Sequence, residues 1–169
     1  MESSKILEVG LLYQETLESI VANYPSGTCY LAGYCLAEYF RTKGFESKSV
    51  TGSLALMDKN GKYIVYGNLS IPKSNKIGSY HTWCEIFIND EWYILDPSLK
   101  YNKVTLIKIY RFKLNSKIPD LLFTNDKNTY VWKYIPNENL VKESNNFLEK
   151  ASIEIKDGII QSLIKSSIF

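Results

Sequence analysis

Cysteine and histidine are scarce in this chain of 169 residues. The cysteines are Cys29, Cys35 and Cys84, and an odd, low number of cysteines does not form a disulfide framework. We therefore expect a protein of a reducing compartment, the cytoplasm. His81 is the single histidine, so any chemistry that combines a thiol with an imidazole has one possible base.

Long apolar runs and blocks of basic charge are also missing. No stretch reaches the roughly 18 apolar residues of a membrane span, and the N-terminal segment has acidic residues but no apolar block of the signal-peptide type. Lys and Arg total 20 against 18 Asp and Glu, and the basic residues are scattered. We expect a soluble protein without a nucleic-acid or membrane partner, although secretion without a cleaved signal stays open.

Apolar residues are abundant enough for a globular fold. They make up 45% of the chain, and the length fits one domain over residues 1–169. Helical spacing predicts three helices, over residues 6–23, about 28–43 and 152–164. Gln14 lies outside the apolar stripe of the first helix, which the Tyr-Pro-Ser-Gly segment at residues 24–27 is expected to end.

The middle of the chain favours β-structure. Strands are predicted over residues 47–56, 62–68, 81–88, 91–96, 104–112 and 129–135. The segment Asp58-Lys59-Asn60-Gly61 predicts a turn, because Asn-Gly is a strong hairpin signal. Residues 71–79 predict a loop, and residues 137–147 are polar and fit no element clearly.

The segment HTWCEIFINDEWYILDP, residues 81–97, is the most informative part of the chain. If Asn89-Asp90 is a two-residue hairpin loop, Ile88 faces Glu91 and the register places Trp83 opposite Asp96. His81 and Asp96 then become diagonal neighbours on one face of the sheet. Both faces carry large apolar residues, which predicts a central hairpin covered on both sides. Glu85 lies on a buried face and needs a polar partner.

Cys29 is the candidate that completes this pair. It follows Ser-Gly-Thr at the predicted start of an apolar helix, where the partial positive charge stabilises a thiolate and backbone N–H groups can hold an oxyanion. A carboxylate such as Asp96 fixes the tautomer of an imidazole and leaves its other nitrogen to serve a nucleophile. Cys29, His81 and Asp96 are therefore the predicted catalytic residues for acyl transfer.

Four motifs in this order resemble those of the transglutaminase-like superfamily. Gly27-Thr28-Cys29 at the head of an apolar helix resembles its nucleophile motif, and Gly44-Phe45 followed by Val50-Thr51-Gly52 resembles the stretch after that helix. The H-x-W-x-E strand begins at His81, and the closing W-x-x-x-D-P begins at Trp92. The match covers about residues 27–98, and the order Cys, His, Asp agrees. Arylamine acetyltransferases share that order, but the flanking sequences expected of them are absent here.

The resemblance implies an α+β, papain-like fold in which the nucleophile helix packs on an antiparallel sheet that carries His81 and Asp96. It implies a cysteine-dependent hydrolase or transferase that acts on a protein or peptide carboxamide through a thioester. A protease, an amidase and a glutamine deamidase are all of this type. No metal or organic cofactor is implied. The oxyanion-hole side chain that many members supply upstream of the helix cannot be assigned in this sequence.

Other interpretations stay open. A catalytically silent transglutaminase-like domain that binds a protein partner is one, and an acyltransferase with a small thioester donor is another. A zinc site is disfavoured by spacing: Cys29 and Cys35 diverge along a helix, and His81 and Cys84 point to opposite faces of a strand. Cys35 and Cys84 are expected in the core. The oligomeric state and the role of residues 104–169 are left open by the sequence.

Overall fold

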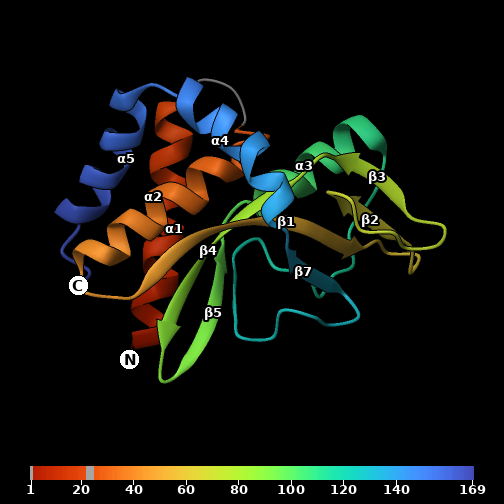
Figure 1. The fold of residues 1–169 in the computed structure, drawn as a ribbon, viewed down its shortest axis with the longest axis horizontal. Helices are drawn as coiled ribbons and strands as arrows, with labels where there is room; N and C mark the ends of the chain where they lie inside the picture. The colour runs from red at the N-terminus through yellow and green to blue at the C-terminus, as the bar shows by residue number, and fades with distance from the viewer. Residues whose placement is uncertain (1, 22–24) are drawn as a thin grey trace.

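A computed structural model describes residues 2–21 and 25–169 as an α+β structure (Figure 1). Its helices are α1 (Glu2–Ile20), α2 (Cys29–Thr42), α3 (Leu99–Tyr110), α4 (Val141–Lys150) and α5 (Ile153–Lys165), with a 3-10 turn η1 (Glu138–Leu140). Its strands are β1 (Ser47–Met57), β2 (Tyr63–Tyr66), β3 (Asn75–Gly78), β4 (His81–Ile88), β5 (Glu91–Asp96), β6 (Leu122–Thr124) and β7 (Trp132–Pro136).

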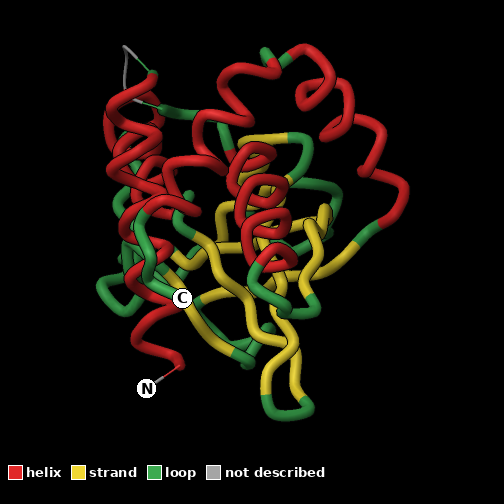
Figure 2. Tube along the Cα trace, turned by 90° about the vertical axis from the view of Figure 1, so that its left-hand side faces the viewer, coloured by secondary structure: helices red, strands yellow, loops and turns green. Residues whose placement is uncertain are grey.

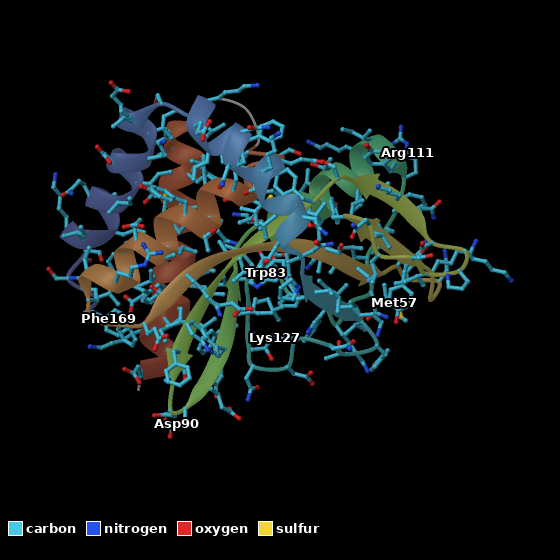
Figure 3. The ribbon with its side chains drawn as sticks, in the orientation of Figure 1. Met57, Trp83, Asp90, Arg111, Lys127 and Phe169 are labelled. Carbon is cyan, nitrogen blue, oxygen red and sulfur yellow. The ribbon has the colours of Figure 1, made fainter. Side chains whose placement is uncertain are left out.

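The strands form one sheet in the order β3-β2-β1-β4-β5-β6, with β7 also paired to β1. All pairs are antiparallel except β2 with β3. β1 is the longest strand and joins the two halves of the sheet, because its start pairs with β4 and its end pairs with β2 and β7. The β4–β5 hairpin protrudes at one end of the molecule, with Asp90 at its tip (Figures 2 and 3).

Two apolar cores lie on opposite faces of this sheet. One is formed by α1, α2 and α5 against hairpin residues that include Cys84, Ile86 and Leu95. The other packs Trp83 and Ile94 of the same hairpin against α3 and the strands β1, β2 and β7. The predicted central position of the hairpin, covered on both faces, is therefore confirmed. The termini meet on one side of the molecule, where Lys5 Nζ lies 5.3 Å from the centre of the Phe169 ring (Figure 1).

The hairpin register agrees with the sequence prediction. Ile88 pairs with Glu91, and the pairing continues to Cys84 with Leu95, which confirms the two-residue loop. Asn89 and Asp90 have φ values of 50° and 65°. Both therefore adopt the left-handed conformation that a type I′ turn requires and that Asn and Asp tolerate well.

The strand predicted over residues 104–112 is wrong, because residues 104–110 belong to α3 and the next two residues form no strand. Its alternating apolar residues do not correspond to one buried face: Leu106 is buried, whereas Ile107 and Ile109 are exposed. The helix is stabilised by tertiary packing of Leu99, Tyr101 and Leu106, and packing outweighs β-propensity. The left-handed Arg111 ends it.

Smaller differences concern short elements. The predicted loop at residues 71–79 contains β3, which pairs in parallel with β2, and β6 was not predicted. Strands of three or four residues give too little periodicity for detection. Residues 137–147, left open by the sequence, form η1 and part of α4.

The predicted helices at residues 28–43 and 152–164 are confirmed as α2 and α5. The first helix begins earlier than predicted, at Glu2, and is described to Ile20. Its predicted last residues 22 and 23, and residue 24 of the predicted stop, lie outside the described residues. None of the helices in the described part of the chain combines the length and apolar character needed to cross a membrane.

Candidate active site

The three predicted catalytic residues come from three elements that meet at one place. Cys29 is the first residue of α2, His81 the first of β4 and Asp96 the last of β5. α2 packs directly on β4, and Gly33 permits the close approach. A Cβ at Gly33 would lie 2.5 Å from both Ser49 Oγ and Thr82 Cγ2, so any larger residue would push the helix away from the sheet. This contact holds Cys29, one turn before Gly33, beside the start of β4.

His81 and Asp96 form a buried pair. His81 Nε2 lies 2.7 Å from Asp96 Oδ2, and both side chains are almost inaccessible to solvent. The predicted diagonal contact across the hairpin is therefore confirmed. Since Asp96 binds Nε2, the second ring nitrogen, Nδ1, is the one left for a thiol, and the nearby Cys29 side chain contributes to the raised pKa of His81.

The Asp96 carboxylate receives further hydrogen bonds that the sequence did not predict. The Ser98 backbone N–H donates to Oδ1 at 2.9 Å, and the Tyr134 hydroxyl of β7 donates to Oδ2 at 2.8 Å. Burial, and then the negative charge of Asp96, raise the pKa of Tyr134 well above its ordinary value. Tyr134 therefore stays a donor, and the Asp96 carboxylate is contacted by three polar groups, from His81, Ser98 and Tyr134.

These contacts decide the charge of His81. Burial lowers the pKa of the imidazole, but the charge and hydrogen bond of Asp96, and the interaction with Cys29, raise it to about 10. The rise outweighs the loss of solvation because the partners are in direct contact. His81 is therefore an imidazolium at neutral pH, held between the carboxylate of Asp96 and the sulfur of Cys29.

A cavity of about 420 Å³ opens on this pair. Cys29 and His81 form part of its wall, and Tyr66, Tyr80, Asn102 and Phe147 are other lining residues. The volume is that of a site for a small molecule or one substrate side chain. Among the described residues that line it there is no Asp, Glu, Lys or Arg, so His81 carries the positive charge of the wall.

The turn before α2 is held by side-chain hydrogen bonds. Ser26 Oγ lies 2.6 Å from Thr105 Oγ1 of α3, and Thr28 Oγ1 donates to the Pro25 carbonyl at 2.9 Å. Gly27 has a φ of 74°, which a glycine adopts without strain. The turn thus presents Cys29 and the first backbone N–H groups of α2, which have no acceptor within the helix, at the cavity.

The position of Gln14 differs from the sequence prediction. It is buried, and its Nε2 donates to the carbonyl oxygens of Pro97, at 2.9 Å, and Asp120, at 3.1 Å. The sequence prediction places Gln14 outside the apolar stripe because it is polar. Periodicity cannot show that a buried amide donates hydrogen bonds to carbonyl groups far away in the chain. Gln14 fixes the chain directly after Asp96.

Glu85 and the other two cysteines have structural positions. As predicted, Glu85 is partnered: it accepts from Trp83 Nε1 at 3.1 Å and from Lys127 Nζ at 2.8 Å. Cys35 and Cys84 lie in the core formed by α1, α2 and α5. Burial raises the pKa of Cys35 to about 12 and also raises the pKa of Cys84. In residues 2–21 and 25–169, no three His, Cys, Asp or Glu side chains form a group suited to a metal ion.

The fold has a counterpart among solved structures. A crystal structure of a genomics target, APC5867, has a TM-score of 0.54 to this chain at 9% sequence identity, over 97% of this chain and 79% of the other. At such low identity the likeness concerns the fold alone. No model of a known protein family matches the chain. A search of curated proteins also finds no match.

Proposed function

We propose that this protein is a transglutaminase-like cysteine hydrolase or acyltransferase that forms a thioester at Cys29. The observation that carries the proposal is the position of His81, whose ring is bound at Nε2 by the buried Asp96 carboxylate and which lines one cavity together with Cys29. Asp96 is the counterion of the buried imidazolium. Cys29 lies at a helix N-terminus, a position that favours a reactive thiol.

The arrangement supports a papain-like core. The nucleophile lies at the start of a helix packed on an antiparallel sheet, and base and carboxylate lie on adjacent strands of that sheet. The motif resemblance over residues 27–98 points to the same group of enzymes.

The proposed reaction needs only the chain's own residues. The Cys29 thiolate attacks the carbonyl carbon of an amide, and the C=O electron pair moves onto oxygen. The His81 imidazolium then gives its proton to the departing nitrogen, the C–N bond breaks, and a thioester remains. Neutral His81 next takes a proton from water or an amine, whose attack releases the acyl group and restores the thiolate. Asp96 keeps the ring oriented and stabilises the imidazolium in each half-reaction.

The lining of the cavity favours an uncharged acyl group. Tyr66, Tyr80 and Phe147 supply aromatic surface, and the Phe147 ring lies 6.0 Å from that of Tyr80 and 5.7 Å from that of Tyr30. An acidic or basic substrate side chain would lose its hydration there without a partner of opposite charge in the described lining, apart from the contact of an acid with His81. A protein or peptide carboxamide, neutral and able to accept hydrogen bonds, is the proposed substrate.

Alkylation of the thiols against pH tests this proposal. The folded protein would be labelled with iodoacetamide and analysed by peptide mass spectrometry. Cys29 should be modified rapidly below pH 7, whereas an ordinary thiol, with a pKa of about 8.5, reacts only at higher pH. His81→Ala should slow the labelling at pH 6, and Cys35, buried in the core, is the internal control. Labelling of Cys29 that is slow at pH 6 and unaffected by His81→Ala would instead support a silent binding domain.

A further inference from the structure

One polar group in the cavity wall has no partner. The Nδ2 atom of Asn102 is buried, and it makes no hydrogen bond to any residue that the structure describes. Asn102 lines the same cavity as Cys29 and His81. The two other unpartnered buried groups in the described residues are the hydroxyls of Tyr13 and Tyr39, which belong to the core formed by α1, α2 and α5. A buried donor left unpaired is unfavourable, and one that lines a cavity is available to a ligand.

Asn102 is also held firmly in place. It lies in the first turn of α3, where its backbone N–H donates to the Ser98 carbonyl at 3.0 Å, directly after the Asp96-Pro97 pair. One turn further, Thr105 Oγ1 lies 2.6 Å from Ser26 Oγ in the turn that leads to Cys29. The start of α3 is thus tied to Asp96 on one side and to the nucleophile turn on the other. The backbone of Asn102 is therefore fixed relative to both Asp96 and the nucleophile turn, as the scaffold of a catalytic donor must be.

We propose that Asn102 is the side-chain donor of the oxyanion hole. This inference rests on the proposed function. The Asn102 Nδ2–H group donates to the carbonyl oxygen of the bound acyl group, together with the backbone N–H groups at the start of α2. The family resemblance implies a donor upstream of the nucleophile helix, whereas Asn102 belongs to the helix that follows Asp96.

The bond changes define when the donor matters. As the Cys29 sulfur bonds to the carbonyl carbon, the C=O electron pair becomes a full negative charge on oxygen, and the hydrogen bond from Asn102 becomes charge-assisted and stronger. When the charge returns to re-form the C=O bond, the leaving group departs with the proton of His81. Alkylation by iodoacetamide differs, since sulfur displaces iodide from a CH₂ carbon and no oxyanion forms. Asn102 should therefore assist acylation and not alkylation.

Two reactions of the same thiol separate these roles. The acylation rate would be followed as the release of p-nitrophenolate from p-nitrophenyl acetate in a stopped-flow instrument, and the alkylation rate with iodoacetamide. Asn102→Ala should lower the acylation rate constant on the order of a hundredfold and leave the alkylation rate within about twofold. Asn102→Asp, of the same shape but without the donor, should lose at least as much acylation. Asn125→Ala, which changes an exposed asparagine on a loop outside the cavity, is the matched control.

Each outcome has one meaning. If wild-type protein acylates and Asn102→Ala acylates as fast, the inference is wrong while the proposed function stands. If both rates fall together in Asn102→Ala and Asn102→Asp, the residue has a structural role and the inference is again wrong. If the wild-type protein shows no Cys29-dependent acylation, the proposed function fails first. Circular dichroism of each variant shows whether it is folded, and Asn102→Leu, which is uncharged and close in shape, carries the test if Asn102→Ala is not.

Discussion

His81 Nε2 lies 2.7 Å from Asp96 Oδ2 in a position that solvent hardly reaches, and His81 lines the same cavity as Cys29. The pair is formed by the first residue of one strand and the last residue of the next, so a tight two-residue turn is what sets its geometry. A buried imidazolium and carboxylate depend on each other, because either one alone would be an unpaired charge in the interior.

Asp96→Asn should therefore affect both stability and reactivity. Removing one partner of a buried ion pair lowers the free energy of unfolding by about 3–5 kcal/mol, and the wrong imidazole tautomer should slow acylation by about 10³–10⁴-fold. Urea unfolding and stopped-flow acylation measure the two effects. Asp126→Asn, on an exposed loop, is the control and should change neither. Acylation that survives in Asp96→Asn would contradict the assigned role.

The raised pKa of His81 predicts how stability depends on pH. The ring has a pKa of about 10 in the folded protein and about 6.5 in the unfolded chain. The folded state thus binds the proton more tightly, and the stabilisation is complete below pH 6.5 and lost as the pH rises towards 10. Urea titrations from pH 6 to pH 10 would compare the single variant Cys29→Ala, which has no thiol at the site, with the double variant Cys29→Ala and His81→Gln. The free energy of unfolding should fall more steeply with pH in the single variant. Parallel curves would mean that His81 is neutral in the fold.

The Tyr134 hydroxyl should help to hold Asp96. Tyr134→Phe removes only the donor, and a hydrogen bond to a charged group contributes about 1.5–3 kcal/mol to the free energy of unfolding. Tyr63→Phe is the matched control, because the Tyr63 hydroxyl donates to the Tyr130 carbonyl at an exposed site. Thermal or urea unfolding should show a clear loss for Tyr134→Phe and little for Tyr63→Phe. Equal effects would contradict a special contribution of the bond to Asp96.

Two glycines in helices should respond in opposite directions to substitution by alanine. At Gly33 the new methyl group would collide with the sheet, so overpacking should destabilise the protein by about 1–3 kcal/mol and slow the labelling of Cys29. At Gly158 of α5 a Cβ meets no atom within 4 Å, so alanine should stabilise the helix by about 0.5–1 kcal/mol. A neutral Gly33→Ala would show that α2 does not need its close approach to β4.

The hairpin and the nucleophile helix could be predicted from the sequence because their signals are local. The Asn89-Asp90 turn determines the register, and the register determines that His81 meets Asp96. Cys29 was recognised from the Ser-Gly-Thr turn at the start of an apolar helix, which gave its position but not the hydrogen bonds that fix the turn.

The supporting residues could not be predicted, because they reach the site from distant parts of the chain. Tyr134 arrives on β7, 38 residues after Asp96, and Gln14 contacts Pro97 across 83 residues. Asn102 was assigned to no element, since the apolar residues that follow it resembled a strand rather than α3. Such contacts depend on how elements pack, and a single sequence records packing only as apolar periodicity.

The central claim is that Cys29 forms a thioester with the help of His81, and trapping that thioester tests it most directly. Protein mixed with p-nitrophenyl acetate would be quenched in acid and digested, and the peptides would be analysed by mass spectrometry, for the wild type, Cys29→Ala and His81→Ala. We predict one acetyl group on Cys29 in the wild type, none at this position in Cys29→Ala and strongly reduced acetylation in His81→Ala. Acetylation of lysines alone, equal in all three proteins, would contradict the account.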